Sequence, residues 1–169
     1  TNCSCTGVRS SAGIRKIFNR MTIQSRIEID KPPSEVYEFL MDEENLSLWV
    51  TNFIRAEKLG GESGEPGYRS RHLYSENGRQ LEMIEEVEEV IENRKFAATL
   101  YGKPYHMKIA NEIRPLPSGG SELSGRIEYR PHHPFSALLV WLRHGKFLRR
   151  LRHDLESFKV AVEQLEPEN

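Results

Sequence analysis

The stretch EIDKPPSEVYEFLMDEENLSLW, residues 28–49, joins an extended segment to a helical one and indicates how the chain is built. The overlapping segment 22–30 alternates isoleucine with polar side chains, which is the period of a half-buried β-strand. Pro32 and Pro33 end this strand, because proline has no N–H to donate to a β ladder.

A helix is expected directly after the two prolines. Ser34 suits the N-cap position, and apolar side chains at i, i+3 and i+4 from Val36 onward create one buried face. A second short helix is expected over residues 43–47, and Trp49 after it should rim or plug one end of the sheet. The stretch therefore predicts architecture rather than the place where chemistry occurs.

Between residues 51 and 130 the hydrophobic period changes to two. Strands joined by short turns form an antiparallel meander with one covered face and one solvated face. Asn77-Gly78 is the strongest local hairpin signal among these turns. We expect six strands here, near 51–59, 67–75, 79–90, 94–101, 104–114 and 120–130.

The end of the chain has a helical period, and we expect a long helix over about 146–166. Its apolar stripe consists of Leu148, Leu151, Leu155, Phe158, Val162 and Leu165. Just upstream, PFSALLVWLRHG predicts a short apolar helix closed by Gly145. Since a sheet must bury its apolar face, we expect an α+β fold. A curved seven-stranded antiparallel sheet wraps around the C-terminal helix, with two short helices between strands one and two.

Three passages, in this order, resemble the START/polyketide cyclase-like (SRPBCC, helix-grip) superfamily of the polyketide cyclase/dehydrase and lipid transport type. They are residues 27–49, the central hairpin at 78–102 and LRHDLESFKVAVEQ at 151–164. The resemblance implies one helix-grip domain over 21–166, followed by a tail at 167–169. It also implies a cavity between the sheet and the long helix that holds an apolar or amphipathic small molecule.

Alternation along the predicted strands suggests which side chains would face that cavity. The same tyrosines and methionines could equally fill a solid core, so the pattern leaves both interpretations open. The candidate cavity residues are Trp49, Tyr68, Ser70, His72, Tyr74, Met83, Glu85, Tyr105, Met107, Asn111, Tyr129, Trp141, Leu148, Leu151 and Leu155.

His72 and Glu85 are the two titratable groups of most interest in this set. A hairpin register near residues 75 and 78 would place His72 opposite residue 81, with Glu85 beyond the end of the shorter strand. The two are therefore not expected to touch. Glu85 is expected to be solvated at a β-bulge, and the alternative is a desolvated acid with a raised pKa, suited to proton transfer.

The segment 143–153 is rich in arginine, lysine and histidine and follows the apolar run at 139–142. We expect a solvated helix face, and the alternative is attraction to anionic headgroups or a carboxylated ligand, with transient membrane contact at an apolar lip. No cofactor and no metal are expected. The histidines that could suggest a metal lack ligand spacing: His132, His133, His144 and His153.

The composition describes an ordinary globular protein. Its 169 residues are 37% hydrophobic and 29% charged, with a formal net charge of −1, which argues against a nucleic-acid binder. Both cysteines, Cys3 and Cys5, lie near the start and cannot cross-link a core, which favours the cytoplasm. Residues 1–20 are basic and are expected to be a non-native or flexible extension, with Met21 as the alternative native start.

Three hypotheses about function follow. The first is binding or transport of a hydrophobic or amphipathic small molecule that is lipid-like or polyketide-like. The second is a cyclase- or dehydratase-type enzyme acting on such a ligand in the same cavity, and the third is a partner-binding module like the co-chaperone members of the superfamily. No nucleophile motif such as G-x-S-x-G is present, so the sequence shows no carrier for a covalent mechanism. Whether a reaction is catalysed stays open, and so does the oligomeric state.

Overall fold

The computed structural model describes residues 20–103 and 105–164. Its centre is a seven-stranded sheet with the order β1-β7-β6-β5-β4-β3-β2, antiparallel at every pairing. The strands are β1 (Met21–Ile29), β2 (Phe53–Gly60), β3 (Arg69–Glu76), β4 (Arg79–Ile91), β5 (Lys95–Tyr101), β6 (Tyr105–Pro115) and β7 (Ser121–Pro131). The predicted meander is confirmed, with strand ends displaced by at most two residues.

Helix α2 (Pro33–Met41), the 3₁₀ turn η1 (Glu43–Asn45) and α3 (Leu46–Trp49) connect β1 to β2. The predicted N-cap was wrong, because Pro32 occupies that position and Pro33 opens the helix. Proline is favoured there, since its fixed φ is already helical and its missing N–H would have had no partner. The second helix also starts as a tight 3₁₀ turn, where the Asp42 carboxylate accepts a hydrogen bond of 2.9 Å from the backbone N–H of Glu44.

The chain ends in α4 (Pro134–Leu142) and α5 (His144–Gln164). Gly145 does not close α4, as the sequence suggested, because α4 stops at Leu142 and Gly145 already belongs to the first turn of α5. The buried face of α5 carries Phe147, Leu151, Leu155, Phe158 and Val162, which confirms most of the predicted stripe. Leu165, the last member of that stripe, lies outside the described residues, as do the two cysteines.

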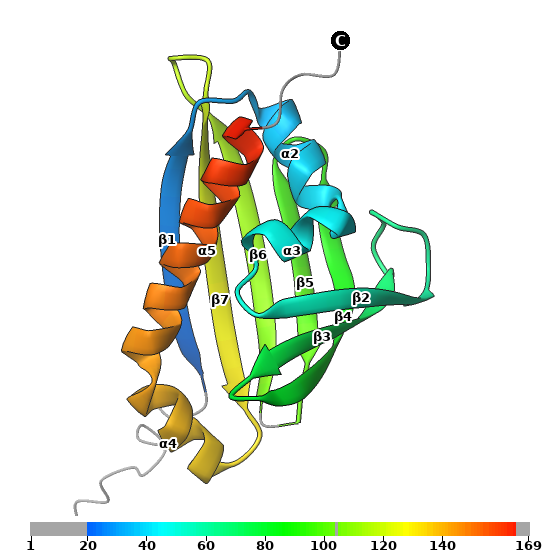
Figure 1. Cartoon of the computed structure of the whole chain (residues 1–169), viewed down its shortest axis with the longest axis vertical. Coiled ribbons are helices and arrows are strands. Elements are labelled where there is room, and N and C mark those ends of the chain that lie inside the picture. Colours follow the sequence, from blue (N-terminus) through cyan, green and yellow to red (C-terminus); the bar gives the residue numbers. More distant parts are fainter. Residues whose placement is uncertain (1–19, 104, 165–169) are drawn as a thin grey trace, which may run out of the picture.

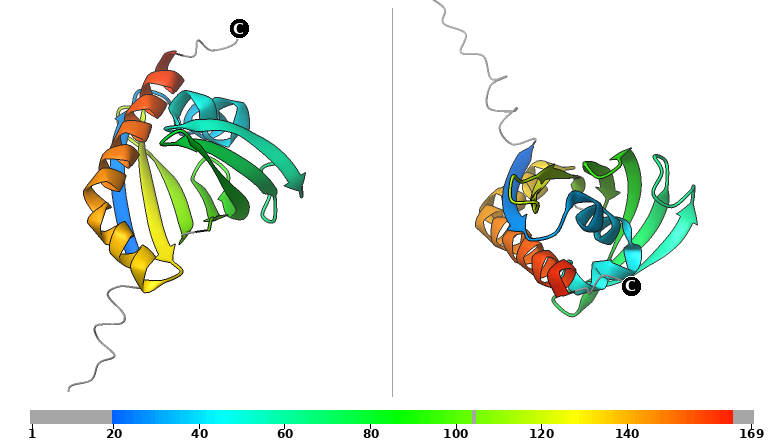
Figure 2. Two further views of the ribbon diagram at one scale, coloured as in Figure 1. Left: turned by 60° about the horizontal axis from the view of Figure 1, so that its bottom comes forward. Right: turned by 90° about the horizontal axis from the view of Figure 1, so that it is seen from above.

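Figures 1 and 2 show how these parts enclose an interior. The sheet curls from β1 round to β2, α5 packs along β1, and α3 packs between α5 and β2. The long helix therefore covers the concave face of the sheet, and α2 and α3 cover one end of the space between them. This arrangement confirms the helix-grip architecture.

The stretch of residues 28–49 is held to α5 from both of its ends. The Phe158 ring makes edge-on contacts with Phe39 at 4.9 Å and with Trp49 at 5.2 Å between ring centroids. At the other end of the stretch, the Lys159 ammonium donates to the backbone oxygen of Glu28 at 2.8 Å. These contacts fix where α2 and α3 sit above the sheet, and hence the shape of the interior.

The β3–β4 hairpin has a different register from the predicted one. Glu76 pairs with Arg79, and the two turn residues, Asn77 and Gly78, have φ of 52° and 74°, as a type I′ turn requires. His72 consequently faces Met83, and Glu85 lies opposite Ser70 within the paired region. A shift of two residues keeps the same faces but changes every neighbour, which matters for the site below.

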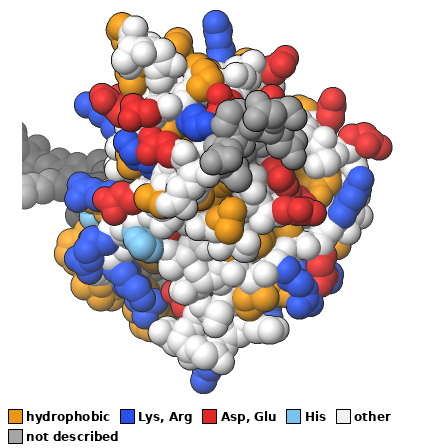
Figure 3. Space-filling model, turned by 45° about the horizontal axis from the view of Figure 1, so that its top comes forward, with side chains coloured by type: hydrophobic (Ala, Val, Ile, Leu, Met, Phe, Trp, Pro, Cys, Tyr) orange, Lys and Arg blue, Asp and Glu red, His pale blue; other side chains and the backbone are white. Residues whose placement is uncertain are grey.

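The outer surface carries charges of both signs. In the face drawn in Figure 3, acidic and basic side chains lie side by side rather than in separate fields. On the outer face of the sheet, for example, Glu88 of β4 accepts hydrogen bonds from Thr99 and Lys108. The glutamates of β4 other than Glu85 are exposed or half-buried and form a solvated acidic face.

Candidate ligand-binding site

A cavity of about 170 Å³ lies between the concave face of the sheet and α5. Its walls come from α2, η1, α3, strands β2 to β7, the β2–β3 loop and α5. The volume is close to that of an engineered apolar cavity of ~150 Å³ that admits benzene. It therefore accommodates a ring-sized group directly, and a longer molecule only if part of it extends through the opening.

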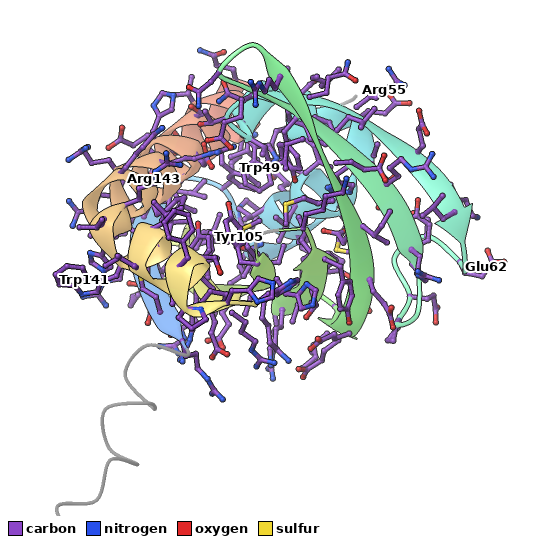
Figure 4. All side chains as sticks on the ribbon, turned by 90° about the horizontal axis from the view of Figure 1, so that it is seen from below. Trp49, Arg55, Glu62, Tyr105, Trp141 and Arg143 are labelled. Carbon is purple, nitrogen blue, oxygen red and sulfur yellow. The ribbon has the colours of Figure 1, made fainter. Side chains whose placement is uncertain are left out.

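Twelve of the predicted cavity residues line this space: Trp49, Tyr68, His72, Tyr74, Met83, Glu85, Tyr105, Met107, Asn111, Tyr129, Leu151 and Leu155. Figure 4 shows Trp49 and Tyr105 pointing into the interior, whereas Trp141 lies at the outer edge. Ser70 is fully buried behind the wall, where its hydroxyl contacts His72.

Trp141 and Leu148 do not line the cavity, which corrects the prediction for both. Helix α4 buries Ala137 and Val140, so Trp141, about 100° further round the helix, is 63% exposed. Leu148 packs half-buried against the core, and its neighbour Phe147 takes the inner position by stacking on Tyr129 at 4.6 Å. The helical period predicted the correct face of α5, but in its first turn Phe147, and not Leu148, is the residue that points into the cavity.

His72 is the centre of a short chain of hydrogen bonds. Its Nε2 lies 2.9 Å from the Ser70 hydroxyl and its Nδ1 lies 3.3 Å from the Tyr74 hydroxyl. Burial lowers the pKa of His72 to about 4, so the imidazole is neutral at pH 7. One of its nitrogens then donates and the other accepts, which lets either neighbour complete the chain.

Glu85 is buried rather than solvated, with 7% of its surface exposed, which overturns the expectation from the sequence. The irregularity in β4 lies between Val87 and Glu89 and does not release Glu85 from the wall. Burial, and secondarily the charge of Glu43, raises the pKa of Glu85 to about 8. Its carboxyl group is therefore mostly protonated at neutral pH.

The side chains of His72 and Glu85 also approach each other, contrary to the prediction. His72 Nε2 lies 3.7 Å from Glu85 Oε1, too long for a hydrogen bond. With the imidazole neutral and the acid protonated, this proximity is not a salt bridge at pH 7. It is a pair of uncharged groups that differ in proton affinity and face the same space.

Glu43 joins this polar end from the η1 turn, and nothing in the alternation of the strands pointed to it. The Tyr68 hydroxyl donates to Glu43 Oε2 at 3.0 Å, and burial raises the pKa of Tyr68 to about 12. Within the described part of the chain, Glu43 Oε1 is buried without a hydrogen-bond partner. The donor atoms of Glu43, His72 and Glu85 all lie within 4.8 Å of one another.

A second polar group lies where α5 passes the α3–β2 junction. The Thr51 backbone N–H donates to the Asp154 carboxylate at 3.0 Å, and the Thr51 hydroxyl donates to the same oxygen. Arg150 donates to the Thr51 carbonyl oxygen. Through these hydrogen bonds Arg150 and Asp154 hold α5 against Thr51, just after α3. Both side chains also line the cavity.

The apolar side chains of α4 remain largely in solvent. We call this set the α4 face: Phe135, Leu138, Leu139, Trp141 and Leu142. The basic side chains Arg143, His144, Lys146 and Arg149 follow directly in the chain, and all four are exposed. An exposed apolar patch next to positive charge is unusual on a surface that makes no contacts.

The remaining predicted histidines lie away from the cavity. His132 contacts the ring of His106 at 4.2 Å on the outside of the sheet, and His133 caps α4. His144 and His153 are exposed on α5. The cluster that could hold a metal in residues 20–103 and 105–164 is therefore made from His72 and two glutamates, not from these histidines.

Solved structures similar to this one have low sequence identity to it. A START superfamily protein from Mycobacterium smegmatis has a TM-score of 0.69 at 19% identity, over 86% of this chain and 99% of its own. A protein from Thermus thermophilus matches with a TM-score of 0.69 at 19% identity, over 84% and 97%. Ara h 8.0201 matches with a TM-score of 0.67 at 13% identity, over 85% and 97%. At these identities the likeness establishes the fold alone.

No curated protein matches the chain. Among the described helices, none is both long and apolar enough to cross a membrane. The sequence pattern of the family described as "Polyketide cyclase / dehydrase and lipid transport" matches residues 20–163, which is most of the chain. The chain therefore belongs to the polyketide cyclase/dehydrase and lipid transport family.

Proposed function

We propose that this protein binds an amphipathic small molecule, with a ring-sized apolar body and a polar group at one end. The observation that carries the proposal is the division of the cavity wall. Apolar side chains such as Leu100, Met107 and Leu155 line its body, while Glu43, His72 and Glu85 gather in one cluster, which we call the polar end. Arg150 and Asp154 form a separate polar group in the wall contributed by α5. Apolar pockets with a few convergent polar groups are the usual form of small-molecule sites.

The polar end supports a ligand that offers a hydroxyl or carbonyl group. The protonated Glu85 can donate a hydrogen bond, and Glu43 Oε1 can accept one. The indole N–H of Trp49 is another buried group without a partner among the described residues. Unpaired buried groups are costly, and a ligand that completes them recovers that cost.

The test compares naphthol with naphthalene, which differ by one hydroxyl group. Naphthol is expected to bind more tightly to the wild type, measured by isothermal titration or by fluorescence. The Glu85→Ala and His72→Ala variants should reduce that preference, while Glu86→Ala, on the outer face, should keep it. Equal and negligible binding of both compounds to a folded wild type would overturn the proposal.

A cavity-filling substitution provides a second test. Met107→Trp places a larger ring inside the cavity and should abolish binding of both compounds, whereas Arg114→Trp, at the exposed end of the same strand, should not. Native mass spectrometry of the purified wild type should also detect a bound small molecule that is absent from Met107→Trp.

The second candidate function is proton-transfer catalysis on such a ligand, of the cyclase or dehydratase type. It is favoured by one observation, a protonated Glu85 that faces a neutral His72 at 3.7 Å. A general acid and a general base with shifted pKa values in one pocket are what such chemistry uses. Solvent deuterium exchange at carbons next to a bound ketone, lost in both Glu85→Gln and His72→Asn, would separate this candidate from binding alone.

We also propose that the α4 face makes transient contact with an anionic membrane surface from which the ligand is exchanged. The exposed apolar side chains and the adjacent arginines and lysine match an interfacial contact. Co-sedimentation with vesicles containing anionic lipid should exceed that with neutral vesicles. The double variant Phe135→Ser, Trp141→Ser should lose it, and Val160→Ser, exposed elsewhere on α5, should not. The cytoplasmic location stays a prediction.

A further inference from the structure

We propose that Glu43, His72 and Glu85 form a binding site for a divalent transition-metal ion of the Zn²⁺ type at the polar end of the cavity. These three residues come from η1, β3 and β4, and their donor atoms lie within 4.8 Å of one another. Carboxylate oxygen and imidazole nitrogen are ligands that suit Zn²⁺ and its neighbours in the first transition row. The site goes beyond the proposed function, because a metal ion can bind whether or not an organic ligand is present.

The state of the two carboxyl groups is the observation that points to a cation. Glu85 is 7% exposed, and its carboxylate oxygen Oε1 lies 3.7 Å from His72 Nε2. The Oε1 atom of Glu43 is also buried and unpaired among the described residues. A buried carboxyl group beside a second carboxylate with a buried, unpaired oxygen is costly to keep charged without a cation. One divalent cation would satisfy both.

The neighbouring hydroxyl groups are placed as supports for metal ligands. Tyr68 donates to Glu43 Oε2, which orients that carboxylate and leaves Oε1 facing the cluster. The Tyr74 hydroxyl lies 3.3 Å from His72 Nδ1 and can accept a hydrogen bond from it, which leaves the Nε2 lone pair toward Glu85. Hydrogen bonds of this kind to the far side of a ligand fix its orientation and tautomer at metal sites.

The distances require only local adjustment. Donor atoms bound to one tetrahedral ion at ~2.1 Å lie roughly 3.4 Å apart, and the His72–Glu85 pair already stands at 3.7 Å. The Glu43 carboxylate closes the remaining gap by rotation, and the Ser70 hydroxyl gives up its contact with His72 Nε2. Three protein ligands leave a fourth position toward the cavity, as in zinc sites that bind an exchangeable molecule.

The experiment titrates chelator-treated protein with Zn²⁺ by isothermal calorimetry and with Co²⁺ by visible absorbance. We expect one equivalent to bind and the melting temperature to rise with metal concentration. His72→Asn and Glu85→Gln should each weaken binding by at least roughly tenfold, and Glu43→Gln should do the same without altering either strand. His132→Asn and Glu86→Gln are the matched surface controls and should bind as the wild type does.

Two results would overturn the site. One is a folded wild type that binds neither ion at millimolar concentration. The other is binding that survives His72→Asn and Glu43→Gln but is lost in His132→Asn, which would assign it to the outer histidines. Circular dichroism of each variant establishes that it is folded before its titration is compared. Naphthol binding is measured separately in chelator. A protein that binds no metal can therefore still support the proposed function, and a protein that binds no naphthol can still support the metal site.

Discussion

His72 Nε2 lies 3.7 Å from Glu85 Oε1, on adjacent strands of a hairpin whose register places neither residue directly opposite the other. His72 faces Met83 and Glu85 faces Ser70, so the two side chains meet diagonally across the inner face of the sheet. Diagonal neighbours lie within reach of long side chains. The hairpin turn at Asn77-Gly78 thus brings together the two groups on which the chemistry of the cavity depends.

The first prediction concerns the pH dependence of stability in metal-free protein. The pKa of Glu85 is raised to about 8 by folding, so the folded state retains a proton that the unfolded state has lost. Stability from this group is complete below its unfolded pKa and is lost as pH rises through 8. The pKa of His72, lowered from 6.5 to about 4, has the opposite effect only below about pH 6.5.

Between about pH 6.5 and pH 8, the wild type should therefore lose about 2 kcal/mol of unfolding free energy through Glu85, at ~1.4 kcal/mol per pH unit. The Glu85→Gln variant should lack this slope, and Glu86→Gln should retain it. Urea unfolding at several pH values in chelator measures the difference. An unchanged slope in Glu85→Gln would mean that Glu85 is ionised in the folded protein.

A second prediction uses the two tryptophans as reporters. Trp49 lines the cavity, and Trp141 is 63% exposed on α4. In Trp141→Phe, the remaining emission should be shifted to shorter wavelength and should change when naphthalene binds. In Trp49→Phe, the emission should be that of a solvated indole and should not respond. A response confined to Trp49→Phe would place the ligand outside the cavity.

The third prediction concerns the joint between α5 and the α3–β2 junction. Asp154→Ala leaves the Thr51 N–H and hydroxyl without their acceptor and should destabilise the fold by about 1–3 kcal/mol. Glu156→Ala, exposed on the same helix, should change stability by less than about 0.5 kcal/mol. Chemical denaturation of both variants decides this, and equal effects would show that the joint contributes nothing specific.

The fourth prediction tests the aromatic contact that holds α2 and α3 to the long helix. Phe158 is fully buried against Phe39 and Trp49, so Phe158→Ala should cost about 3–5 kcal/mol. Val160→Ala, two residues away and half-exposed, should be close to neutral. Thermal unfolding of the two variants gives the comparison, and a small loss for Phe158→Ala would mean that the helices are held mainly by other contacts.

Local patterns in the chain were enough to predict the architecture. The prolines after Ile29, the alternation from residue 51 onward and the apolar stripe of α5 each depend on neighbours in sequence, and the structure confirms all three. The inward faces of β3, β4, β6 and β7 followed from the same alternation, because side chains point to opposite sides of a strand in turn. A register error of two residues leaves these faces unchanged, which is why they could be predicted despite the wrong register.

The details of the site depended on contacts between distant segments. Three such details depend on how one element lies against another. They are the diagonal approach of His72 and Glu85, the position of Glu43 on a 3₁₀ turn beside them, and the exposure of Trp141. The sequence alone therefore determined which elements form and which faces turn inward. Only the tertiary structure decided that Glu85 is buried beside His72 and Glu43, because burial and the resulting pKa depend on groups brought together by folding rather than by chain order.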